Sequence, residues 1–69
     1  MRKRSINIHG HQTSISIEEE FWQVLKDIAT QEKLSLNKMI AKIDDQRDPL
    51  THNLSSAIRI YILKTLKGN

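Results

Sequence analysis

Side chains that could carry out metal or acid–base chemistry are few in this sequence and stand apart from one another. His9 and His11 flank Gly10, whereas His52 lies far along the chain. A zinc site needs several ligands that converge on one point, and the lack of cysteine removes the thiolate ligands altogether. We therefore expect no metal site and no cofactor, and we interpret His9 and His11 as turn residues or as residues that bind a partner surface.

The three consecutive glutamates Glu18 to Glu20 form a run of carboxylates. No neighbouring base, nucleophile or glycine-rich phosphate loop accompanies them, so the pattern does not indicate a catalytic site. Negative charge is instead favourable at the N-terminus of a helix. A chain of 69 residues also leaves little room for a closed substrate pocket. The sequence therefore argues against an enzyme.

Polar and apolar residues alternate just before these glutamates, over residues 11–17, which predicts a β-strand. Its polar face would carry Gln12, Ser14 and Ser16. Its apolar face would carry Thr13, Ile15 and Ile17. Ser16 and Glu19 have the spacing of a capping box, so a helix should begin directly after the strand. A single strand of this length cannot fold alone and needs a partner.

Three helices are expected after the strand, because apolar residues recur every three or four positions. They cover residues 18–33, 35–47 and 54–67. Ser35 is the expected N-cap of the second helix, and either Asn53 or Ser55 that of the third. The third helix is apolar around most of its circumference, which indicates burial on more than one side.

Residues 1–10 allow two interpretations. Ile6 and Ile8 alternate with polar residues, which favours an extra strand that folds back through a turn at His9 and Gly10. The basic run Arg2-Lys3-Arg4 favours a flexible arm instead. The composition fits both.

The whole chain, residues 1–69, is expected to form one small domain. At this size a core rarely supplies more than about 3–5 kcal/mol, so oligomerisation is the remaining way to enlarge it. The net charge of +3 and the basic N-terminus suggest a polyanionic partner. No apolar run is long enough to span a membrane, and no signal-peptide core follows the basic start. We therefore expect a cytoplasmic protein with no membrane partner.

The order of these elements resembles that of a known family. The segments QTSISIEEEFWQVLKDIA and QEKLSLNKMIAKI resemble the strand, first helix, junction and second helix of the ribbon-helix-helix DNA-binding domain, the superfamily of the Arc, MetJ and CopG repressors. The resemblance covers residues 12–43, and Lys33 stands where the family often has a glycine. It implies a mostly α-helical fold with a short strand. Two copies would intertwine, each giving one strand to a two-stranded antiparallel ribbon, with the third helix as an addition.

The resemblance also implies how DNA would be bound. The polar strand face would enter the major groove, with Gln12, Ser14 and Ser16 reading the bases. Phosphate contacts would come from the start of the second helix, whose backbone N–H groups carry partial positive charge, and from the basic N-terminus. The candidate phosphate ligands are Ser35, Asn37, Lys38, Arg2, Lys3 and Arg4.

A core shared between the two copies is the last implication of the resemblance. The candidates for this dimer core are Ile15, Ile17, Phe21, Trp22, Leu25, Ile28, Met39, Ile40, Ile43, Ile58 and Ile62. Our leading hypothesis is a transcriptional repressor or autoregulator that binds double-stranded DNA as a homodimer. The alternative is a protein-interaction module, since members of this superfamily can act as antitoxins. The third helix would then dock a partner protein.

Overall fold

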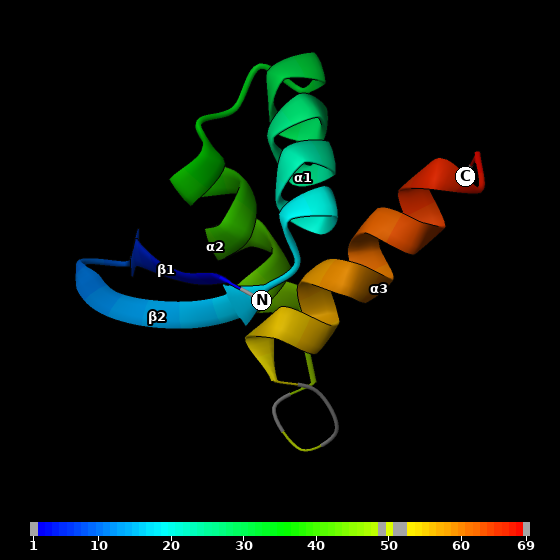
Figure 1. Cartoon of the computed structure of the whole chain (residues 1–69). Coiled ribbons are helices and arrows are strands. Elements are labelled where there is room, and N and C mark those ends of the chain that lie inside the picture. The colour runs from blue at the N-terminus through cyan, green and yellow to red at the C-terminus, as the bar shows by residue number, and fades with distance from the viewer. Residues whose placement is uncertain (1, 49, 51–52, 69) are drawn as a thin grey trace.

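The computed structural model describes residues 2–48, 50 and 53–68, and these residues form two antiparallel strands followed by three helices (Figure 1). The strands are β1 (Arg2–Ile8) and β2 (His11–Ile17). The helices are α1 (Glu19–Gln31), α2 (Leu36–Gln46) and α3 (Leu54–Leu66). The prediction of a mostly helical chain with three helices after a strand is confirmed.

The two strands form a hairpin within one chain. His9 and Gly10 make the turn, and both have positive φ angles, 53° and 81°, as a two-residue type I′ turn requires. The segment 1–10, which could be an arm or a strand, is therefore a strand over its described part. Within the described chain, β1 is a partner of β2. Pairing of β2 with a second copy, which the resemblance implied, stays a prediction. The register runs from Arg2 opposite Ile17 to Ile8 opposite His11.

The hairpin has an apolar face that packs on the helices. Its buried residues are Ile6, Ile8, Ile15 and Ile17. Thr13 lies on the same face as Ile15 and Ile17, as predicted, but its side chain is exposed in this chain. Thr13 lines a groove of about 550 Å³ between β2 and the start of α3, and this opening leaves its side chain accessible.

The predicted N-cap residues are confirmed for two of the three helices, α2 and α3. The Ser35 hydroxyl accepts a hydrogen bond from the backbone N–H of Lys38 at 3.2 Å, which confirms Ser35 as the N-cap of α2. Asn53, one of the two candidates for α3, accepts one from the N–H of Ser56 at 2.8 Å. Among the described residues, Ser16 does not form the predicted capping box with Glu19. Glu18 is the N-cap of α1 there and makes no side-chain cap bond.

The junction between α1 and α2 explains how Lys33 replaces a glycine. Lys33 adopts a left-handed φ of 59°. Its N–H donates to the carbonyl of Thr30 at 3.1 Å, and the N–H of Leu34 donates to that of Ala29 at 2.9 Å. This pair of bonds is the Schellman motif, in which glycine usually holds the left-handed position. The chain therefore makes the turn with a lysine.

The hydrophobic core closes within a single chain. Of the candidates for a dimer core, Phe21 is half-buried and the others are buried by their own chain. The fully buried ones are Ile17, Leu25, Met39, Ile40, Ile58 and Ile62. Both strands and all three helices contribute to this cluster. Its side chains are therefore shielded from water by their own chain, without a second copy.

Helix α3 is buried on one side and apolar on another that stays in water. Ala57, Ile58 and Ile62 face the core, whereas Leu63 and Leu66 are 56% and 66% exposed. Figure 1 shows the C-terminal end of α3 extending away from the hairpin. Burial on more than one side, as the sequence suggested, is therefore not reached within the described chain. None of the helices in the described ranges has the length and apolarity needed to cross a bilayer.

Candidate nucleic-acid interface

The face of the hairpin that points away from the helices is polar along its whole length. We define the outer ribbon face by its six exposed residues, which are Lys3, Ser5, Asn7, Gln12, Ser14 and Ser16. They form three cross-strand pairs, Lys3 with Ser16, Ser5 with Ser14, and Asn7 with Gln12. Directly opposite residues of an antiparallel pair have Cβ atoms about 4.5–5.5 Å apart, so these side chains form one continuous surface. In Figure 1, α1 and α2 lie above the hairpin, and α3 lies beyond the end of β2.

A groove on each side of the ribbon adds further polar groups. Along β1, a groove of about 510 Å³ places Asn7 beside Asn37, Lys38 and Lys42 of α2. Along β2, the groove that contains Thr13 is also lined by residues from β2, α2 and the start of α3. Its polar lining includes His11, Ser14, Ser16, Arg47, Asn53 and Ser55. Two of the phosphate candidates, Asn37 and Lys38, thus lie next to the ribbon, while Ser35 serves as a cap.

Arg4 lies on the opposite face of β1 from Lys3 and is held beneath the ribbon. Its guanidinium forms an ion pair with Glu19, and its Cζ lies 4.7 Å from the centre of the Trp22 ring. The Nε atom is buried without a hydrogen-bond partner among the described residues. These contacts join β1 to the first turn of α1 through a charge and an aromatic face. The side chain of Arg2 lies outside the described part of the structure.

Arg59 of α3 makes a similar pair of contacts with the start of α1. Its Nε donates to Glu18 at 2.9 Å, and its Cζ lies 5.9 Å from the Phe21 ring centre. The hydrogen bond from Arg59 lowers the pKa of Glu18, because it favours the charged carboxylate. The glutamate run, interpreted from sequence only as favourable to the helix N-terminus, therefore also binds two arginines.

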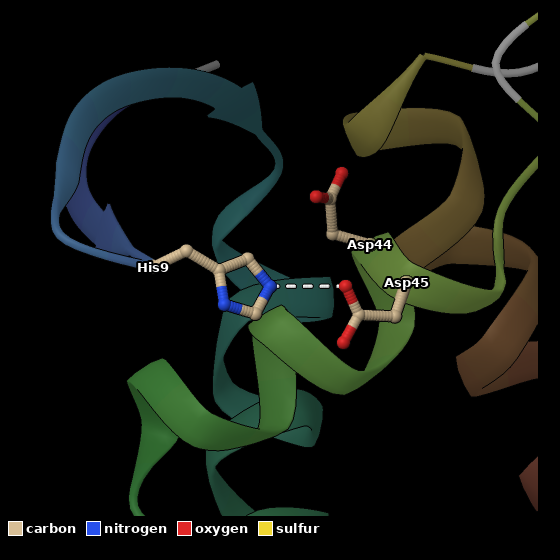
Figure 2. A group of neighbouring side chains, drawn as sticks. All are labelled: His9, Asp44 and Asp45. Carbon is tan, nitrogen blue, oxygen red and sulfur yellow. Dashed lines mark hydrogen bonds and ion pairs between the residues drawn. The ribbon is translucent and has the colours of Figure 1, made fainter.

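The turn of the hairpin is attached to α2. The Nε2 atom of His9 lies 2.9 Å from an Asp45 carboxylate oxygen, and Asp44 accepts from the Nε of Arg47 at 2.6 Å. Figure 2 shows His9 and Asp45 pointing toward each other. The ligand-type atoms of His9, Asp44 and Asp45 lie within 4.8 Å of one another. The hydrogen bond between His9 and Asp45 and the ion pair between Asp44 and Arg47 account for this grouping, and the first of them links the turn to α2.

The structure brings together some of the predicted site residues and adds others. Gln12, Ser14 and Ser16 share the exposed outer ribbon face. The residues that the sequence analysis missed are Ser5 and Asn7, which β1 contributes to the same face. Their signal was the alternation with Ile6 and Ile8, which marks the extra strand.

Comparison with known protein families identifies the chain's domain. The ribbon-helix-helix domain matches residues 1–66 of the chain, which includes both strands and all three helices. Searches of curated proteins and of solved structures found no significant match.

The orientation of β1 predicts that substitutions of two neighbouring basic residues differ in their effect on stability. Arg4→Gln should lower the free energy of unfolding by about 1 kcal/mol, because it removes the contacts to Glu19 and Trp22. Lys3→Gln, on the exposed face, should change it by less than about 0.5 kcal/mol. Urea denaturation followed by Trp22 fluorescence measures both. Equal stability of the two variants would contradict the assigned faces.

Proposed function

Because the chain belongs to the ribbon-helix-helix family of DNA-binding domains, whose members bind DNA as dimers, we propose that it is a sequence-specific regulator of transcription. In this proposal it acts as a homodimeric repressor or autoregulator of its target genes. The outer ribbon face enters the DNA major groove, which is wide enough for a two-stranded ribbon.

The observation that carries this proposal is the exposed polar surface of the ribbon. Its residues are hydrogen-bonding types, and the buried isoleucines on the other face hold the strand pair against the helices. Gln12 can bond adenine in bidentate fashion, and Ser14 and Ser16 can bond several base edges. We assign these three residues to base contacts.

Phosphate contacts are assigned to the rims of the ribbon. The start of α2 offers backbone N–H groups together with Asn37 and Lys38 next to β1. A helix N-terminus and a lysine are both suited to a phosphate oxygen. Ser35 supports this site as the cap, and Lys3 adds charge at the end of the ribbon. Such contacts fix the position of the protein on DNA without reading its sequence.

Dimerisation is assigned to α3. The core is complete in one chain, so the dimer contact has to use apolar residues that remain exposed. Leu63 and Leu66 provide these near the C-terminal end of α3. Exposed apolar side chains grouped on one element are typical of protein–protein contacts.

A second candidate function uses the same helix. An antitoxin-like protein would dock a different protein on Leu63 and Leu66 rather than a second copy. The exposure of these two leucines favours this candidate as much as it favours dimerisation, and the quaternary state of the purified chain separates the two.

DNA binding is tested by the salt dependence and the sequence preference of the purified protein. The logarithm of the affinity should fall linearly with the logarithm of the salt concentration, since phosphate contacts release counterions. Ser14→Ala should alter the preference at one or two base pairs by roughly fivefold, while its unfolding curve stays unchanged. Affinity that does not respond to salt, or an equal loss on every DNA sequence, would contradict the proposal.

The assignment of α3 predicts a change of quaternary state. Leu63→Lys should raise the dissociation constant of the dimer at least tenfold, because it places a charge in the apolar contact. Leu50→Lys is the matched control, since Leu50 is 92% exposed and lies outside α3. Sedimentation equilibrium measures both. A monomeric wild-type chain that purifies with a second protein, and loses it on Leu63→Lys, would instead support the antitoxin-like candidate.

A further inference from the structure

We infer that Arg4 and Arg59 are positioning residues for DNA binding, because they hold the start of α1 from two sides and so fix the orientation of the hairpin relative to the helices. This inference rests on the proposed DNA binding and deepens it, and in it neither arginine contacts DNA. We call this group of contacts the two-arginine clamp. Its members are Arg4, Glu19 and Trp22 on the side of β1, and Arg59, Glu18 and Phe21 on the side of α3. Every contact of the clamp is made within one chain, so the clamp does not depend on how two copies assemble.

The clamp is built on a repeated spacing at the start of α1. Each arginine contacts a glutamate and the aromatic ring three positions later. The two pairs are Glu18 with Phe21, and Glu19 with Trp22. Residues three positions apart are neighbours on a helix surface, so each pair offers a carboxylate beside a ring. Consecutive residues point about 100° apart around a helix, and the two pairs therefore face different neighbours, β1 for one and α3 for the other.

The junction between β2 and α1 is the part of the chain that α3 holds. Glu18 is the one residue between the two elements, since β2 ends at Ile17 and α1 begins at Glu19. Glu18 is the N-cap of α1, yet its side chain makes no cap bond. Its carboxylate instead accepts a hydrogen bond from the Nε of Arg59 at 2.9 Å. Rotation of the strand about this junction is thus opposed by a contact from a different helix.

The other strand is held through Arg4. Its side chain is 24% exposed and lies on the face of β1 that is turned toward the helices, where it contacts Glu19 and Trp22. To reach a DNA phosphate on the outer side, it would have to give up both contacts. Its neighbours Lys3 and Ser5 point to the opposite face, because side chains alternate along a strand. The anchoring of Arg4 therefore fixes the direction of these two outward residues.

The clamp supplies a direction that burial alone does not supply. The inner isoleucines hold the hairpin on the helices, but the hydrophobic effect is non-directional. A guanidinium has a fixed plane, and its contacts to a carboxylate and to a ring depend on that plane. Partly exposed ion pairs add little stability, so the effect of the clamp is expected in orientation more than in folding. An element already held in its bound orientation has less order to gain on binding.

The first experiment measures the orientation of the hairpin without DNA. The chain has no cysteine, so Ser5→Cys and Gln31→Cys place one spin label on exposed sites of β1 and α1. Pulsed electron paramagnetic resonance, with labelled chains diluted in unlabelled ones, gives the distance distribution within one chain. Arg4→Met and Arg59→Met should each broaden this distribution about twofold, because the contacts that remain are non-directional. Lys26→Met, which removes an exposed charge from α1, is the matched control and should leave it unchanged.

The second experiment measures DNA binding well below the unfolding temperature of every variant, so that loss of stability alone has no effect. Arg4→Met and Arg59→Met should weaken binding to a DNA sequence selected by the wild type about tenfold. Binding to unrelated DNA should stay within about twofold, with an unchanged dependence on salt, since the phosphate contacts remain. Arg4→Lys and Arg59→Lys keep the charge and should recover part of the loss. Lys26→Met should behave as the wild type.

Each outcome has a defined consequence. An equal loss on all DNA sequences together with a weaker salt dependence would make the arginine a phosphate ligand, and the inference would be overturned. An unchanged distance distribution, or an unchanged preference for the selected sequence, overturns it as well, while salt-dependent binding by the wild type leaves the proposed function standing. A wild type without salt-dependent binding overturns both. If a methionine variant does not fold by circular dichroism, the lysine variant replaces it, and a smaller change in the same direction is expected.

Discussion

The pairing of β1 with β2 in the same chain is the constraint on which the rest of the structure depends. It provides the partner strand that a seven-residue strand needs, and it does so through a two-residue turn at His9 and Gly10. Side chains alternate strictly between the two faces of a strand, so a shift of one residue in this pairing would exchange the faces. The buried isoleucines oppose that shift. The polar side chains are therefore kept outward by the burial of their neighbours.

The two arginine contacts connect this ribbon to the helices. Arg4 reaches α1 from β1, and Arg59 reaches the same helix start from α3. Each combines a carboxylate with an aromatic ring, Glu19 with Trp22 for Arg4 and Glu18 with Phe21 for Arg59. Exposed ion pairs contribute little stability singly, yet these two contacts tie the start of α1 to β1 and to α3. Arg4 and Arg59 thus link the ribbon to the helices, although neither residue lies on the outer ribbon face.

Much of the fold follows from patterns in the sequence, and the exceptions have physical causes. The three helices, the cap at Ser35 and the exposed face of Gln12, Ser14 and Ser16 were predictable from periodicity and residue type. The pairing of β1 was left open, because a basic run and an alternating run overlap in the same ten residues. The location of the core was also not predictable. Periodicity shows that Leu25 or Ile40 is buried, but it does not show whether the covering atoms belong to the same chain.

The role of single charges was the hardest to predict. Arg4 was grouped with its neighbours as a phosphate ligand, although only the strand register reveals that Lys3 and Arg4 point to opposite faces. Conversely, Asn7 was not singled out, since only the strand register shows that it lies opposite Gln12 on the exposed face. Both cases show that the function of a polar residue in a strand can be assigned only when the face on which it lies is known.

The intrachain pairing can be measured directly, because the chain contains no cysteine. Ser5 and Ser14 are opposite each other on the exposed face, so the double variant Ser5→Cys with Ser14→Cys places two thiols within the reach of a disulfide. Oxidation in dilute solution followed by a non-reducing gel, with each single variant as a control, reports which chains are joined. The account predicts a disulfide within one chain, which migrates as a monomer. Covalent dimers as the main product would contradict it, since the strands would then be paired between copies.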